Sequence, residues 1–237
     1  MQAVKAWNTA LSSDHYGTIG CLVRTADSVG ILSASHVLAP IMRGVSVGAN
    51  QGISILASDQ TGVGALAKWN VPMNAYGAPI ATARDAAFAT IAPDLQKKLA
   101  YAMGLPNGVR LAQDYGQPAR FFGSTSGRRK NTVIHDIAGR VSMRFRLYNN
   151  DTSYNYSSVE VPLSGLIQCD AQEPVKPGDS GCLLFDTDGY ALGLLVGTDP
   201  TNTYPYFTHL QPILDLFGLQ LITTADYPQA ERLRDLV

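Results

Sequence analysis

Ser180 lies in the segment of this sequence that most favours nucleophilic chemistry, with Gly178 two residues before it and Gly181 directly after it. Ser180 stands in Pro177-Gly-Asp-Ser-Gly-Cys182, directly before an apolar run. A nucleophilic serine needs a tight turn that exposes its hydroxyl, and backbone N–H groups that converge on the oxygen of a tetrahedral intermediate. Gly178 can supply one such N–H without a Cβ in the way. We expect Ser180 to be a nucleophile and the N–H groups of Gly178 and Ser180 to form an oxyanion hole. The alternative is an ordinary turn rich in Gly, Asp and Ser.

A serine of this kind needs a base, and the sequence offers four histidines. His36 follows the apolar stretch Ile31-Leu-Ser-Ala-Ser, a pattern typical of a strand that ends in a turn. The other three, which lie in the N-terminal segment or the second half without a comparable motif, are His15, His135 and His209. His36 is therefore the candidate general base. A half-buried histidine at a strand end is the alternative.

The third candidate is an acid that orients the histidine. Asp85 stands at the start of the apolar run Ala86–Ile91, so an acid there could enter the site from the start of a strand. The alternative is a solvated aspartate at a strand end.

Short apolar runs, separated by turn residues, must carry these side chains. With 22 Gly, 13 Pro and 46% apolar residues against 16% charged ones, the composition favours a turn-rich β protein with a sizeable core. The runs predict strands at 18–24, 29–33, 45–47, 53–57, 86–91, 118–122, 131–135, 138–147, 159–161, 166–168, 182–185, 190–196 and 204–208.

The strands divide into two groups on either side of a linker with helical character at 92–109. We expect an N-terminal surface arm (1–16), a first β-barrel (17–100) with His36 and Asp85, a second β-barrel (101–217) with Ser180, and a C-terminal tail (218–237). Pro212–Phe217, followed by Gly218, predicts a helix, because Pro favours a helix start and Gly the position after its end. A last helix is expected at 229–237.

Charge and composition exclude several classes of function. The net charge of −1 gives no reason to expect binding to nucleic acid or to an anionic membrane. No segment has the pattern of a signal peptide, and no apolar run reaches 18 residues. We expect the three cysteines to be buried thiols in a reducing, cytoplasmic setting. No cofactor or metal is expected, because the sequence has neither a Cys/His ligand cluster nor a GxGxxG motif.

The three candidate segments resemble those of chymotrypsin-like (trypsin-like) serine peptidases. Ile31–Ala39 is similar to the family's Leu-(Thr/Ser)-Ala-Ala-His segment, and the run from Asp85 is similar to its Asp-(Ile/Ala)-Ala-Leu segment. The order His, Asp, Ser is that of this family and not that of subtilisins or α/β-hydrolases. The gaps of 49 and 95 residues suit histidine and acid in one barrel and serine in the next.

The resemblance implies an all-β fold of two six-stranded antiparallel barrels with a C-terminal helix and the site in the cleft between them. It implies hydrolysis of peptide bonds in a peptide or protein substrate through an acyl-enzyme. The segment around Val196, Gly197 and Thr198 resembles the strand that pairs with the substrate backbone. Pro174 falls at the floor of the specificity pocket by this alignment, and His209 is a candidate contact for an acidic substrate side chain.

The sequence departs from the family at three places. Digestive members neutralise the acid before the nucleophile, here Asp179, with a newly cut N-terminus that this chain lacks. In α-lytic-type members an arginine does so, but Ser124 stands at that position. Either Arg120, Arg128 or Lys130 neutralises the acid instead, or it remains hydrogen-bonded and solvated. Val37 replaces the cysteine that would pair with Cys21.

At the third departure, Val196 replaces a serine that often supports the catalytic acid. One hydrogen bond to Asp85 must therefore be missing or come from elsewhere. The loss keeps open a second hypothesis, a catalytically weak or inactive peptidase-fold protein that binds a peptide or protein partner. A chymotrypsin-fold esterase or a polyprotein-processing enzyme is a third.

Overall fold

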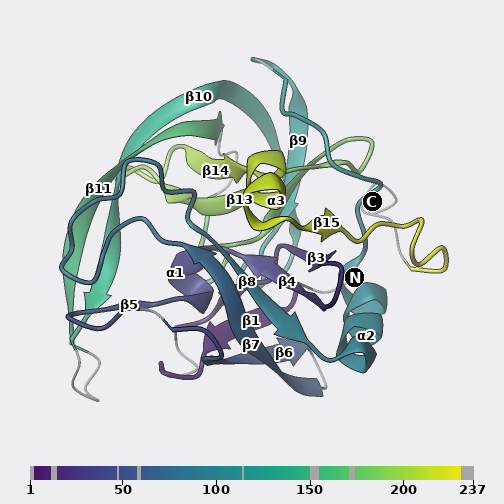
Figure 1. The fold of residues 1–237 in the computed structure, drawn as a ribbon. Helices are drawn as coiled ribbons and strands as arrows, with labels where there is room; N and C mark the ends of the chain where they lie inside the picture. Colours follow the sequence, from purple (N-terminus) through teal and green to yellow (C-terminus); the bar gives the residue numbers. More distant parts are fainter. Residues whose placement is uncertain are drawn as a thin grey trace.

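The computed structural model describes residues 3–11, 15–46, 48–57, 60–113, 115–149, 155–170 and 174–230. Within these residues the chain forms two curled sheets and three helices (Figure 1). The helices are α1 (Ser35–Leu38), α2 (Pro93–Met103) and α3 (Leu210–Phe217). No helix in this part of the chain has the length and apolar character needed to cross a membrane.

The first sheet has eight strands in the order β15-β3-β4-β8-β7-β6-β1-β2 and curls into a half-barrel. Its strands are β1 (Lys5–Asn8), β2 (Gly17–Thr18), β3 (Cys21–Arg24), β4 (Val29–Ser33), β6 (Gly52–Ala57), β7 (Gln60–Asn70), β8 (Ala86–Ile91) and β15 (Gln220–Leu221). Neighbouring strands in this sheet pair in antiparallel fashion, as expected for strands joined by short turns.

The second sheet closes on itself. Its strands are β9 (Pro118–Phe122), β10 (Arg129–Tyr148), β11 (Tyr156–Cys169), β12 (Leu183–Asp186), β13 (Ala191–Thr198) and β14 (Pro205–His209), with the short strand β5 (Ile41–Met42) added beside β10. The order is β11-β14-β13-β12-β9-β10-β5, and the pairing of β10 with β11 completes a ring of six strands. The predicted second six-stranded barrel is thus confirmed.

A shared apolar cluster fixes the two sheets to each other. Phe88 from β8 and Leu194 from β13 belong to one buried cluster with the inner face of α3, including Ile213 and Leu214. Interiors packed in this way have little room to shift. The side chains carried by the two sheets can therefore keep a fixed separation across the cleft.

The β10–β11 hairpin is far longer than the barrel needs. Beyond the barrel wall its strands stay paired from Arg140 and Ser164 out to Tyr148 and Tyr156. Figure 1 shows it arching along one side of the molecule toward α1 and β5. Because β5 comes from the first half of the chain and pairs with β10, this hairpin connects the two halves.

The N-terminal arm predicted for residues 1–16 is wrong where the structure describes it. Lys5–Asn8 is a strand between β2 and β6, and Val4 and Ala6 are fully buried. The alternation in this segment is too short to stand out in the sequence. Gln60–Asn70 also forms a strand that the sequence does not predict, because Gly62 and Gly64 interrupt its apolar pattern.

The described part of the predicted C-terminal tail is not separate either. Gln220 and Leu221 pair with β3, and Ile222 is fully buried in the apolar cluster that also contains Val4 and Ala6. The predicted helix at 212–217 is confirmed as α3, which ends at Gly218 in the left-handed conformation. Of the helix expected at 229–237, residues 231–237 lie outside the described residues. The expected strand at 45–47 is reduced to a bridge at Val45, and Val47 also lies outside them.

The expectation of buried, unpaired cysteines is confirmed. Cys21, Cys169 and Cys182 are all buried and free. Burial raises the pKa of the Cys21 and Cys169 thiols to about 12 and that of Cys182 well above its ordinary value. All three are therefore protonated at neutral pH and poor nucleophiles.

Asn8 tests whether the first strand is structural. Its side-chain amide donates to Leu38 O (2.7 Å) at the end of α1 and to Gln51 Oε1 (3.0 Å). We expect Asn8→Ala to lower the free energy of unfolding by about 1–3 kcal/mol, because a buried carbonyl loses its donor. The exposed bond from Thr9 Oγ1 to Gly52 O makes Thr9→Ala the control, with a change within about 0.5 kcal/mol. If urea denaturation shows that the two variants lose equal amounts of unfolding free energy, the result would support the interpretation of this segment as a surface arm.

Candidate active site

The start of α1 and the start of β8 bring a histidine and a carboxylate together. His36 Nδ1 lies 2.7 Å from Asp85 Oδ2, and the backbone N–H of His36 donates to Asp85 Oδ1 at 3.1 Å. The histidine side chain is 27% exposed and the aspartate only 1%. Asp85 thus holds the Nδ1 side of the ring, and Nε2 lies on the opposite side, away from the buried carboxylate.

A third bond to the same carboxylate comes from Ser35. Its hydroxyl donates to Asp85 Oδ1 at 2.6 Å, and the residue is fully buried. Val196, which has no hydroxyl to offer, lies instead in the apolar cluster beside Met143. The hydrogen bond missing at Val196 is therefore supplied by the residue next to His36, an outcome that Ser35 in the motif Ala34-Ser-His36 could have suggested.

Asp85 is ionised despite its burial. Burial favours the neutral acid, but the His36 ring and the hydrogen bonds from Ser35 and the His36 backbone outweigh it, so the pKa of Asp85 lies below its ordinary value. Asp85 also adopts a φ of 47°, an uncommon conformation for a residue with a Cβ. The packed neighbours on both sides must hold it there.

Ser180 stands on a turn in which positions 178 and 181 require glycine. Gly178 and Gly181 have φ values of 97° and 84°. A Cβ on Gly178 would lie 2.2 Å from Thr125 Oγ1, and one on Gly181 would lie 2.5 Å from Thr18 O. The turn is strained for any other residue and is also closely surrounded.

The carbonyl groups of this turn are bound to the first sheet. Gly178 O accepts from Thr18 Oγ1 (2.8 Å) and Ser124 Oγ (3.1 Å), and Ser180 O accepts from Thr18 N (2.7 Å). In the part of the chain that the structure describes, the N–H groups of Gly178 and Ser180 have no such partner. They are thus free to donate to a bound molecule.

Asp179 points the other way, into the protein, and is fully buried. It accepts hydrogen bonds from the backbone N–H groups of Thr125 (3.1 Å), Ser126 (2.9 Å) and Lys176 (3.0 Å), and from the Ser126 hydroxyl. Lys130, only 3% exposed, places Nζ 3.5 Å from Asp179 Oδ2.

Of the three basic residues considered from the sequence, Lys130 is the one paired with Asp179. Its ammonium group also donates to Pro174 O at 2.5 Å and lies 5.5 Å from the centroid of the Phe121 ring. A buried charge needs a partner and hydrogen bonds of this kind. The serine turn is therefore held without a free N-terminal amine.

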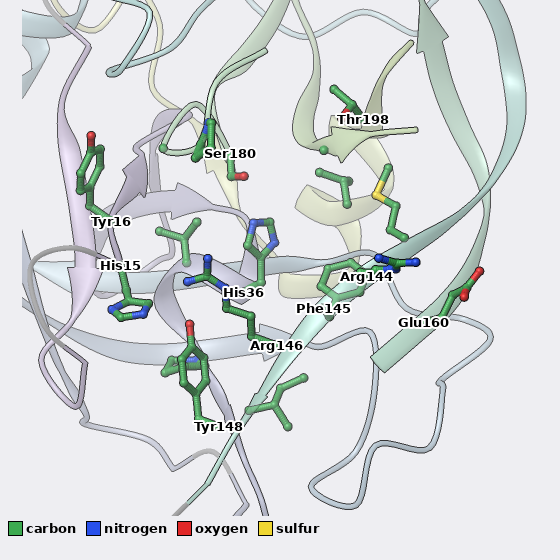
Figure 2. A pocket seen from close by; sticks show the side chains of 18 of the residues that line it. His15, Tyr16, His36, Arg144, Phe145, Arg146, Tyr148, Glu160, Ser180 and Thr198 are labelled. Atoms are coloured by element: carbon green, nitrogen blue, oxygen red, sulfur yellow. The ribbon is translucent and has the colours of Figure 1, made fainter. Parts of the chain in front are cut away.

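Ser180, His36 and the end of β13 line one cavity of about 830 Å³ (Figure 2). The predicted substrate-strand residues Val196, Gly197 and Thr198 lie on its wall, as does Gly178. Pro174 and His209 are not among the described residues that line it. Pro174 holds Lys130 through its carbonyl, and the His209 ring lies 2.9 Å from Ile137 O. The cavity thus gathers His36, Gly178, Ser180 and residues 196–198, but neither of these two.

The end of β13 offers an open edge to this cavity. β12 pairs with β13 only as far as Leu194, and the backbone N–H of Leu195 donates to Cys182 O, just before β12. Residues 196–198 therefore continue past the end of β12, with a register irregularity between Leu195 and Gly197 on the opposite, β14 side. An extended peptide can add to such an edge by backbone hydrogen bonds.

The sequence did not identify the part of the cavity that β10 supplies. Phe145 packs edge-on against the His36 ring, with centroids 5.7 Å apart, and Arg144, Arg146 and Tyr148 line the wall beside it. Alternation of apolar and polar residues marks β10 as a strand, but nothing in it indicates that the strand runs past the barrel to His36. Among the described residues, no group of three or more Cys, His, Asp or Glu side chains could hold a metal ion.

No model of a known protein family matches the sequence, and no curated protein matches it either. Solved structures do match over nearly the whole chain. Protease A of Thermobifida fusca has 18% identity and a TM-score of 0.60, with 94% of this chain and 98% of that chain covered. A Nocardiopsis protease has 17% identity and a TM-score of 0.63 over the same shares.

A third match is described as a chymotrypsin of Cellulomonas bogoriensis, with 21% identity, a TM-score of 0.57 and coverage of 94% and 97%. Identity at this level is informative about the backbone arrangement and not about the activity. The matches cover 94% of this chain and therefore extend over both sheets. The chain has the fold of the chymotrypsin-like serine proteases.

Proposed function

We propose that this protein is a serine endopeptidase that uses Ser180 as nucleophile, His36 as general base and Asp85 as the residue that orients the base. The observation that carries the proposal is the buried 2.7 Å contact between His36 Nδ1 and Asp85 Oδ2, directed away from a cavity that Ser180 also lines. A histidine held by a carboxylate on one nitrogen presents the other to a hydroxyl.

The reaction follows from these positions. Ser180 Oγ attacks the peptide carbonyl as His36 takes its proton, and the carbonyl oxygen becomes an oxyanion that accepts from the N–H groups of Gly178 and Ser180. The tetrahedral intermediate collapses to an acyl-enzyme as His36 returns the proton to the leaving amine. Water then repeats the sequence and releases the acid.

The substrate is proposed to be a peptide or protein that lies along β13. The acyl part would add as a strand to the free edge at Val196–Thr198. The side chain of the second residue before the scissile bond would then contact Phe145 and His36. The hydrogen bond from Ser35 also weakens the argument for an inactive binding protein, because the carboxylate keeps its full set of partners although Val196 has no hydroxyl.

The triad makes a prediction about turnover. Ser180→Ala and His36→Ala should each reduce kcat on a peptide substrate by a factor on the order of 10⁶, and the double variant should be little worse, because the members act as a unit. Asp85→Asn should cost a factor on the order of 10⁴, because it favours the wrong tautomer of His36. Steady-state kinetics with purified variants, each checked for native folding, provide the measurement. Folded variants with the turnover of the wild type would contradict the assignment.

Ser35 makes a separate prediction. Ser35→Ala should lower kcat about 10- to 100-fold with little change in KM, because Asp85 loses a charge-assisted bond worth about 1.5–3 kcal/mol. Adding Val196→Ser should restore part of the rate by supplying a hydroxyl from β13. Ser28→Ala, in a turn remote from the site, is the control. A Ser35→Ala rate equal to that of the control would show that this bond does not support Asp85.

A further inference from the structure

One end of the cavity carries positive charge. Figure 2 shows Thr198 on one side of Ser180 and His36, and His15 and Tyr16 on the other. Arg146 and Tyr148 lie below His36 toward the His15 side, and all of these residues line the cavity. If the acyl part of a substrate pairs with the strand that ends at Thr198, its leaving-group part must extend toward His15.

Arg146 is held in place at this end by aromatic side chains. Its guanidinium carbon lies 4.6 Å from the centroid of the Tyr156 ring, on the neighbouring strand. Tyr148 in turn packs edge-on against Tyr156 and His15, with ring centroids 5.9 and 5.6 Å apart. A stacked guanidinium keeps N–H donors along its edge, and these can bind a carboxylate in a bidentate manner.

The charges around the two ends of the cavity differ. Glu160 is the only carboxylate among the described lining residues, and it lies directly opposite Arg144 in the β10–β11 ladder, at the Thr198 side (Figure 2). At the His15 side, Lys5 adds a second cation, with Nζ 4.1 Å from the centroid of the Tyr16 ring. Asp85 is buried beneath His36 and does not line the cavity.

On the basis of the proposed function, we propose that the end of the cleft formed by His15, Tyr16, Arg146 and Tyr148 binds an acidic side chain on the leaving-group side of the scissile bond. Arg146 is the residue that determines this specificity. Such a contact would add to the general affinity of the cleft for an extended backbone and would favour Asp or Glu in the first two positions after the cleaved bond. Because the site is open to solvent, salt should weaken the preference.

Paired peptides test the proposal. The two members of each pair differ only by Glu or Gln at the first or second residue after the scissile bond, and both carry C-terminal amides so that no terminal carboxylate competes. We expect kcat/KM to be about 3- to 10-fold higher for the Glu peptide at low salt, with the ratio falling toward one at high salt. Arg146→Gln should bring the ratio close to one at any salt concentration.

Arg140→Gln is the matched control, because Arg140 is exposed on the same strand and does not line the cavity. It should keep the Glu preference. Equal kcat/KM values for the two peptides with the wild type, or an unchanged preference in Arg146→Gln, would overturn the proposal.

Binding separates this inference from the proposed function. The Ser180→Ala variant cannot cleave, so fluorescence anisotropy with the labelled Glu and Gln peptides reports recognition alone. Tighter binding of the Glu peptide that is lost in the Ser180→Ala/Arg146→Gln variant supports the subsite even if the wild type cleaves neither peptide, in which case only the proposed function fails. Equal binding of the two peptides overturns the subsite even if both are cleaved.

Discussion

The buried contact between Lys130 and Asp179 is the interaction on which the geometry of the site depends. Asp179 is fully buried beside the serine turn, where its hydrogen bonds from Thr125, Ser126 and Lys176 come from neutral groups, and Lys130 adds the opposite charge 3.5 Å away. Asp179 faces inward, and among the described residues the N–H groups of its neighbours Gly178 and Ser180 have no backbone partner. The same lysine donates to Pro174 O, so that it holds both the turn and the segment leading to it.

Each half of the molecule contributes a part of the site that the other half cannot. The first sheet holds His36 against Asp85 and also binds the carbonyls of the serine turn through Thr18. The second sheet carries the serine turn and the free edge of β13. Its β10–β11 hairpin extends to His36, where Phe145 packs against the ring. The apolar cluster between the sheets, with α3, keeps these parts at a fixed separation.

The fold class, the second six-stranded ring and α3 were predictable from the sequence, because local alternation, turn residues and the Pro–Gly helix boundaries are strong signals. The contact of His36 with Asp85 followed from the motifs in their order along the chain. Other features depend on tertiary contacts that no local pattern encodes. The sequence could not distinguish Lys130 from Arg120 and Arg128 as the partner of Asp179. The strand at Lys5–Asn8 is too short to stand out. Whether Arg146 lines the cavity depends on how far the β10–β11 hairpin extends.

The most direct test of the account is the rate at which a fluorophosphonate labels Ser180 in the intact 237-residue chain, followed by mass spectrometry. The wild type should gain one adduct without any cleavage, and Lys130→Met should label at least tenfold more slowly, because an unpaired Asp179 distorts the turn. Lys176→Met is the control, since that residue reaches Asp179 through its backbone N–H. Wild-type protein that labels only after removal of residues 1–16, or a folded Lys130→Met variant that labels at the wild-type rate, would contradict the account.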